Sequence, residues 1–524
     1  MRYSLCNHWE FTEQWSDAFC RGEPVDCRPV RLPHTCRELP LHYADPSDYE
    51  MVCGYRRALT VPDAPRVFLR FDGAAHQAEI YLNGQLAGQH QGGYTGFTIE
   101  ITDLVHRGTE NLLAVRLDTR EDPSLPPFGF VIDYLTYGGL YREVWLEATA
   151  ESRLTDLFVY TPALHDAVVQ WTAELTPAAV AVRIRLETTE GTLLAEQTAP
   201  AAETGKMQLS VPEAQPWDTE HPVLHHAVAE LLNAAGQPID RKQVTFGFRT
   251  AEFRADGFYL NGKKTFLRGL NRHQSYPYIG YAAPESLQRE DAHILQEELH
   301  CTAVRTSHYP QSQYFLDECD RRGLLVFTEL PGWQHIGDAA WKDAACAMLQ
   351  EIILQNRNHP SIILWGVHIN ESVDDDAFYN RTNKIAHQLD PSRATSGVRY
   401  HRRAAGNAGA LFLHAHSVEQ QTSQARRSGL FAISNKCFRL LCDRCRGVHP
   451  VFVATFWIRM SAPRNCTGLK YFPKKEKSLC AQSCMAGSAS ADRGSLGVYS
   501  VFNPAAGWGQ ASGRQSGASR LPHG

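Results

Sequence analysis

The chain of 524 residues has no run of about 18 or more apolar residues, which excludes an ordinary transmembrane helix. Its opening residues, Met1 to Trp9, lack the apolar core of a secretory signal. These two absences predict a cytoplasmic protein with no membrane partner. Charged residues make up 21% and apolar residues 43%, a composition that excludes a wholly disordered chain or a fibre. At roughly 100–200 residues per domain, the length predicts three or four domains.

The end of the chain lacks acidic residues. Residues 408–524 hold 4 Asp/Glu and 15 Lys/Arg, whereas the first 407 residues hold 53 and 37. The same segment carries 6 of the 14 cysteines and shows no periodicity after the apolar run at 451–457. We therefore predict an irregular, basic, cysteine-rich and disordered tail over 406–524. A shift of the reading frame near Arg402–Asn407 explains all three changes together.

Two other interpretations of the tail are weaker. Cys442 and Cys445 form one CxxC pair, but zinc sites of this kind need a second pair at matching spacing. The basic charge suggests nucleic-acid binding, but aromatic residues are not interleaved with it. We expect neither zinc nor a nucleic-acid partner, and we expect the five cysteines before residue 54 to be free thiols.

The first 405 residues predict three domains. Residues 1–148 contain short alternating apolar runs and a strong hairpin signal, Asn83-Gly84, which together indicate a jelly-roll-like β-sandwich. Residues 149–250 repeat the β pattern at the length of an immunoglobulin-like sandwich. From 251 to 405, five strand-like runs alternate with four helical stretches, as in a (β/α)₈ TIM barrel. A whole barrel needs about eight strands, so this one is predicted to be truncated.

One strand end carries the sharpest candidate for chemistry. The apolar run Ile362–Trp365 is followed by Asn370 and Glu371, and barrel enzymes place their reactive groups at such strand ends. The alternative is that Glu371 caps the next helix, expected near Asp374. The acidic run Asp374–Asp376 itself suits a helix N-terminus, whose dipole favours negative charge.

Several motifs resemble glycoside hydrolase family 2, the β-galactosidases and β-glucuronidases. The segment Arg357–Glu371 resembles the family's acid/base signature, and Ala303–Pro310 followed by Gly323–Phe327 resembles its other signature. Gly269–His273 matches the end of the first barrel strand, and Gly139–Val144 resembles the closing motif of the sugar-binding domain. The resemblance covers about residues 1–405.

The resemblance implies a retaining glycosidase that acts on a small glycoside or oligosaccharide. Glu371 would be the acid/base, and Asn370 would bind the sugar 2-hydroxyl. Planar Arg and neutral His side chains offer fixed donors to sugar hydroxyls. The other residues expected to contact substrate are Arg305, His308, His273, Asn271, Glu329 and Trp333. Some family members use magnesium, but the sequence shows no matching ligand set, so we expect no cofactor. A homo-oligomer stays an open alternative.

The family's nucleophile has no counterpart in this sequence. Retention needs a second carboxylate about 5–5.5 Å from the acid/base. The carboxylates after Glu371 all lack the expected surroundings; they are Asp374, Asp375, Asp376, Asp390, Glu419, Asp443, Glu476 and Asp492. We therefore predict a β-galactosidase-type hydrolase with impaired activity. A β-glucuronidase or another family 2 glycosidase is one alternative, and a carbohydrate-binding protein without turnover is another.

Overall fold

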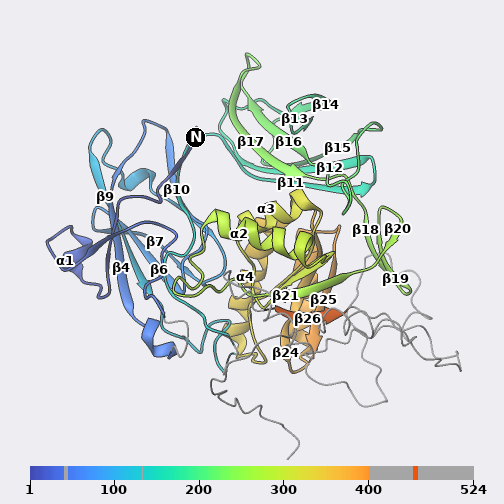
Figure 1. Ribbon diagram of the computed structural model, residues 1–524. Coiled ribbons are helices and arrows are strands. Elements are labelled where there is room, and N and C mark those ends of the chain that lie inside the picture. The colour runs from blue at the N-terminus through green and yellow to red at the C-terminus, as the bar shows by residue number, and fades with distance from the viewer. Residues whose placement is uncertain (40–44, 131, 133, 400–452, 458–524) are drawn as a thin grey trace, which may run out of the picture. The chain divides into compact units, whose positions relative to one another are not determined.

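The protein is described from a computed structural model, which covers residues 1–39, 45–130, 132, 134–399 and 453–457 (Figure 1). The predicted tail therefore lies outside the described residues, apart from 453–457. No helix in the described ranges has the length and apolar character needed to cross a bilayer.

The N-terminal part is a β-sandwich, as predicted. One sheet has the order β1-β10-β5-β8 and the other the order β3-β2-β4-β9-β6-β7. Their strands are β1 (Arg2–Ser4), β2 (Trp9–Thr12), β3 (Arg28–Val30), β4 (Val52–Thr60), β5 (Arg66–Phe71), β6 (Gln77–Leu82), β7 (Gln85–Gln91), β8 (Phe97–Glu100), β9 (Glu110–Asp118) and β10 (Val144–Thr149). Three short helical segments lie between them, namely α1 (Asp17–Cys20), η1 (Pro46–Tyr49) and η2 (Thr102–Leu104).

The predicted hairpin forms between β6 and β7. Asn83 and Gly84 take φ angles of 53° and 78°, the left-handed conformation that a two-residue hairpin turn requires. Alternate residues of β6, among them Ile80 and Leu82, are fully buried in the core between the two sheets.

The second part is an immunoglobulin-like sandwich of a three-stranded and a four-stranded sheet, with orders β11-β12-β15 and β14-β13-β16-β17. The strands are β11 (Arg153–Ala163), β12 (Asp166–Glu174), β13 (Ala181–Thr188), β14 (Leu193–Pro200), β15 (Thr204–Ser210), β16 (His225–Leu232) and β17 (Pro238–Phe246). Its core includes Trp171, Ile184 and Phe248. A small antiparallel sheet follows, made of β18 (Ala251–Arg254), β19 (Gly257–Leu260) and β20 (Lys263–Thr265).

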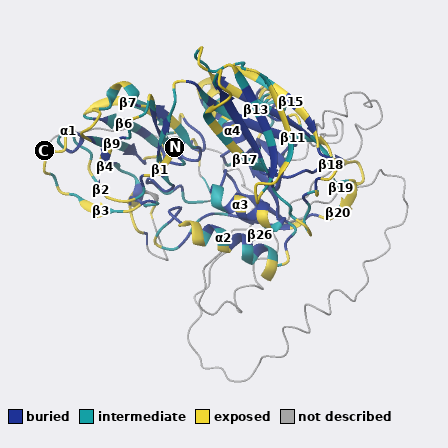
Figure 2. Ribbon diagram, turned by 90° about the horizontal axis from the view of Figure 1, so that it is seen from above, coloured by how far each residue is buried: buried dark blue, intermediate teal, exposed yellow. Residues whose placement is uncertain are grey.

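The third part is the predicted α/β barrel segment with five parallel strands in sequence order. They are β21 (Arg268–Arg272), β22 (Ala303–Thr306), β23 (Leu325–Glu329), β24 (Ile362–Ser372) and β25 (Ala394–Arg399). The helices between them are α2 (Glu285–His293) with its π-helical continuation η3 (Ile294–Glu298), α3 (Gln313–Arg322), α4 (Ala339–Asn356) and α5 (Asp376–Leu389). All nine residues of β22 and β23 are buried, whereas exposed residues appear along α2 (Figure 2). Burial on both faces is typical of a parallel barrel sheet.

One element, β24, differs from the expectation. β24 does not end at Trp365 but continues to Ser372. Asn370 and Glu371 therefore lie among the last three residues of the strand rather than after it. Helix α5 begins at Asp376 with Asp375 as its N-cap, which accepts a hydrogen bond from Phe378 N. Glu371 is therefore not the helix cap.

The apolar run in the tail forms β26 (Val453–Trp457), which pairs with β21 in the antiparallel direction. The next strand beside β21 in a (β/α)₈ barrel would run parallel. This pairing therefore does not continue the barrel.

Candidate active site

Neighbouring strand ends bring four predicted residues together in a buried layer. Arg305 is the penultimate residue of β22, Glu329 ends β23 and Asn370 lies near the end of β24. The Arg305 guanidinium donates through Nε and Nη2 to Glu329 at 2.7–2.9 Å, and Nη2 also donates to Asn370 Oδ1 at 2.8 Å. His308 Nδ1 lies 2.6 Å from Glu329 Oε1.

The contacts within this buried layer determine which of its side chains are charged. Burial alone would raise the pKa of Glu329, but the Arg305 guanidinium and His308 reverse that effect and hold it below its usual value. Burial and the nearby Arg305 charge lower the pKa of His308. Together they outweigh the contact with Glu329, which acts to raise it. The layer thus contains an ionised Glu329, a charged Arg305 and a neutral His308 that donates Nδ1–H to the carboxylate.

Glu371 is more accessible than the residues beneath it, being only partly buried. Its carboxylate Oε2 accepts a hydrogen bond from Gln334 Nε2 at 3.1 Å. Glu371 directly follows Asn370, which belongs to the buried layer, so the two groups adjoin. An accessible carboxyl above fixed hydrogen-bonding groups can exchange a proton with a bound molecule.

The remaining predicted residues lie on the adjoining elements. Asn271 is buried on β21, opposite Arg305 in the strand register, and its Oδ1 has no hydrogen-bond partner among the described residues. His273 Nδ1 lies 3.2 Å from the Tyr309 hydroxyl, and its ring centroid is 5.6 Å from that of His308. The Trp333 ring centroid is 5.1 Å from that of His308. All eight predicted residues therefore lie on β21 to β24 or on the segments that follow those strands.

Sequence reasoning missed two residues at this site. Gln334, in the segment after β23, contacts Glu371 directly. Tyr134 comes from the N-terminal sandwich, and its ring centroid lies 5.4 Å from that of His273 and 6.1 Å from that of His308. Gln334 follows Trp333 directly, which was a usable signal, whereas nothing in the spacing of Tyr134 points to the barrel.

Metal binding at Glu371 has no support in the described residues. Two groups there have carboxylate and His ligands close enough to hold an ion, namely Glu290/His293/Glu298 and Asp317/Asp320/His359. Neither group contains Glu371, so among the described residues no such set of ligands surrounds the candidate acid/base.

The described carboxylates that follow Glu371 have other partners. Asp375 caps α5 and pairs with Lys342 at 2.7 Å. Asp390 is fully buried and accepts hydrogen bonds from Arg393 and Trp365. Asp374 Oδ1 lies 3.8 Å from His368 Nε2. Glu419, Asp443, Glu476 and Asp492 lie outside the described residues.

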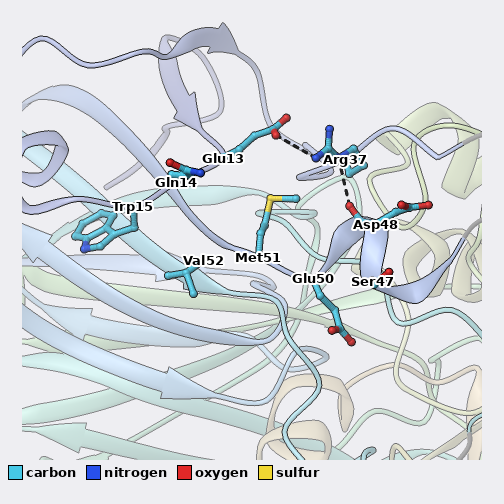
Figure 3. A pocket seen from close by; sticks show the side chains of 9 residues that line it. All are labelled: Glu13, Gln14, Trp15, Arg37, Ser47, Asp48, Glu50, Met51 and Val52. Carbon is cyan, nitrogen blue, oxygen red and sulfur yellow. Dashed lines mark hydrogen bonds and ion pairs between the residues drawn. The ribbon is translucent and has the colours of Figure 1, made fainter. Parts of the chain in front are cut away.

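A depression of about 620 Å³ lies on the N-terminal sandwich and contains none of the predicted site residues (Figure 3). Trp15, Met51 and Arg37 contribute to its lining, and Arg37 is engaged with the side chain of Glu13 and the carbonyl of Asp48. It is a shallow polar surface feature, separate from the strand ends of the barrel sheet.

Three family models match consecutive parts of the chain. The glycosyl hydrolases family 2 sugar binding domain matches residues 32–150, the glycosyl hydrolases family 2 model matches 152–249, and the family 2 TIM barrel domain matches 251–423. The last match ends beyond residue 405, where the sequence resemblance was expected to stop.

Individual proteins give the same result. A β-galactosidase of Thermoanaerobacter pseudethanolicus is 43% identical over 386 residues, which is 71% of this chain and 52% of that protein. A putative β-glucuronidase of Formosa agariphila is 34% identical over 447 residues, 81% of this chain and 52% of that protein. The crystal structure of a putative β-galactosidase from Bacteroides fragilis matches with a TM-score of 0.69 at 28% identity, covering 77% of this chain and 64% of that one. The chain spans about half the length of the curated relatives it matches.

Proposed function

Because the chain belongs to glycosyl hydrolase family 2, we propose that it is a glycoside hydrolase of the β-galactosidase type, built to cleave terminal β-galactosides with retention. The observation that carries this proposal is the arrangement of Arg305, Asn370 and Glu371 at adjoining strand ends of the barrel sheet.

In the proposed mechanism, Glu371 protonates the glycosidic oxygen as the bond to the leaving group breaks, and later deprotonates the attacking water. Asn370 accepts from Arg305 through Oδ1, which orients its side-chain NH₂ toward a sugar hydroxyl. The unpaired Oδ1 of Asn271 is an acceptor for a second hydroxyl. His273, Tyr134 and Trp333 supply the aromatic surroundings of the sugar.

Arg305 and Glu329 support this mechanism indirectly. Both side chains are 2% exposed, so we propose that they hold Asn370 and His308 in place rather than touch the sugar. Glu329 as a substitute nucleophile is disfavoured because its two oxygens are already engaged by Arg305 and His308.

A galactoside is the preferred substrate for two reasons. The relative with the name β-galactosidase is 43% identical, against 34% for the putative β-glucuronidase. In addition, the charge of Arg305 is neutralised by Glu329, so this guanidinium is not available for the carboxylate of a glucuronide. β-Glucuronidase activity remains the alternative within the family.

We further propose that the chain as written lacks the nucleophile because its reading frame changes near residue 405. The loss of acidic residues after residue 407 supports this, as does the antiparallel pairing of β26. The cytoplasmic location, the lack of a nucleic-acid partner and the homo-oligomeric alternative stay predictions of the sequence.

Binding tests the sugar site without requiring turnover. Isothermal titration of the full chain with phenyl β-galactoside should give saturable binding, and phenyl β-glucuronide should bind more weakly. An Asn370→Ala variant should lose binding, because the fixed NH₂ donor is removed. Tighter binding of the glucuronide would favour the alternative substrate, and binding of neither sugar would contradict the proposal.

A further inference from the structure

The segment after β23 lies along the end of β24 residue by residue. Leu330 N donates to Gly366 O at 2.9 Å, Trp333 and Asn370 form a parallel bridge, and Gln334 N donates to Asn370 O at 2.7 Å. The hydrogen bond from the Gln334 side chain to Glu371 is therefore the last of a series that begins inside the sheet.

Gly332 allows this close approach. Its φ is +155°, and a Cβ placed on it would lie 2.8 Å from two side-chain carbons of Ile369. A separation this short would force Ile369 or the segment to move. The segment can lie against β24 in this way because position 332 carries no side chain.

The two residues joined by the hydrogen bond are both in the left-handed conformation. Gln334 has φ 55° and Glu371 has φ 53°. This conformation is unfavourable for residues that carry a Cβ, and it persists where surrounding contacts determine it. Here the backbone pairing on either side fixes both residues, so each side chain leaves its backbone in a defined direction, toward the other.

We propose that Gln334 is a positioning residue that holds the Glu371 carboxyl in line with the glycosidic oxygen. The inference rests on the proposed function of Glu371. A glutamate side chain has three rotatable bonds, and a hydrogen bond from an amide on a fixed backbone selects one arrangement of them. The partly buried Gln334 would thereby favour the reactive geometry and leave sugar affinity nearly unchanged.

An affinity label tests this without any need for the nucleophile. N-bromoacetyl β-galactosylamine places an electrophilic CH₂ where the leaving group of a substrate would lie. A Glu371 oxygen forms a C–O bond to that carbon, the C–Br bond breaks, and bromide departs with the electron pair, giving an ester. Mass spectrometry of the Glu371 peptide measures the labelling rate as a function of reagent concentration in the full chain.

We expect Gln334→Ala to lower the limiting labelling rate about tenfold, with the half-saturating concentration changed less than about twofold. Gln334→Met, which fills similar space without an amide, should behave in the same way and guards against a folding defect in the smaller variant. Gln85→Ala, at an exposed site on β7, should label like the wild type, and Glu371→Gln should not be labelled.

Two results would count against the inference, and they can be told apart. Equal limiting rates for Gln334→Met and the wild type would overturn the role of Gln334 and leave the proposed function standing. If free galactose, added as a competitor, does not slow labelling of the wild type, or if Glu371 is not labelled at all, the proposed function falls and this inference falls with it.

Discussion

Arg305 is the side chain on which the buried layer of the site depends. Its guanidinium donates hydrogen bonds to Glu329 and Asn370 at once. Replacing it by methionine would preserve volume but leave the Glu329 carboxylate buried with His308 as its remaining partner. Removing one partner of a buried ion pair typically costs about 3–5 kcal/mol.

We therefore expect Arg305→Met to lower the free energy of unfolding by about 3–5 kcal/mol in urea titrations and to abolish galactoside binding. Arg254→Met is a matched control, because Arg254 pairs with Glu252 on the surface and both side chains are nearly half exposed. Its stability and binding should equal those of the wild type. An Arg305→Met protein that is as stable as the control would show that the pair contributes little.

The acid/base role of Glu371 predicts how activity depends on the leaving group. If turnover occurs, Glu371→Gln should reduce it by about 10²–10⁴-fold for galactosides with poor leaving groups and much less for nitrophenyl galactosides. Only a poor leaving group needs a proton as the glycosidic bond breaks. Rates measured across a series of leaving groups would show this as a steeper dependence on leaving-group pKa in the variant. An equal loss for all substrates would contradict the acid/base role.

The site residues that the sequence predicts and those that it does not predict differ in how they reach the site. Asn370, Glu371, Arg305 and His308 belong to contiguous motifs on barrel strands, where the order of parallel strands already predicts that their ends adjoin. Gln334 and Tyr134 reach the site through a close approach of loops. That approach depends on Gly332 and on packing between domains, which hydrophobic periodicity does not report.

At the scale of elements, alternation of apolar runs with helical stretches was sufficient to predict the five parallel strands and four helices. The apolar run that stops at Trp365 predicts a shorter β24 than the structure has. The strand continues because the segment 330–334 and β25 pair with its last residues on either side. Such pairing is a property of neighbours far apart in sequence, so the strand's own residues could not reveal it.

A charged cluster lies between α3 and the residues that precede β24. His359 Nδ1 lies 2.5 Å from Asp320 Oδ2 and 3.9 Å from Asp317 Oδ1, and its Nε2 lies 3.1 Å from Gln313 Oε1. Burial alone would lower the pKa of His359, and the Arg393 charge acts in the same direction. The two carboxylates outweigh both and raise it.

This cluster predicts a pH-dependent stability. Because the folded-state pKa of His359 is raised, its stabilisation is complete below the unfolded value of about 6.5 and is lost as the pH rises through the folded value. We expect His359→Gln to cost about 1–3 kcal/mol at pH 6 and less at pH 9, measured by urea unfolding at each pH. A cost that is the same at both values would indicate that His359 is neutral throughout.

At the scale of the whole molecule, the candidate site is assembled from more than the barrel. Arg142 of the N-terminal sandwich donates to Pro310 O at 3.0 Å, and Trp341 of α4 donates to Phe128 O at 3.0 Å. Arg249, just after the second sandwich, donates to the carbonyls of Pro360 and Ile362 at the start of β24. Both sandwiches therefore fix strands and loops that carry proposed site residues, which is consistent with three family models matching in unbroken succession.

The last prediction is that the chain as written hydrolyses galactosides at least about a thousandfold more slowly than a version with the reading frame corrected after Arg402. Without the nucleophile, the covalent intermediate that divides the displacement into two easier steps cannot form. Among the described residues, β25 pairs with β24 alone, so the described part of the sheet ends in an edge strand that a closed barrel would not have. Poor solubility should accompany the low activity for that reason.

The measurement is turnover of a chromogenic galactoside by the two purified proteins, with sugar binding as the control that the site has formed in both. Turnover of the uncorrected chain within tenfold of the corrected one would show that another carboxylate serves as nucleophile, and the tail would then have to be a genuine part of the enzyme.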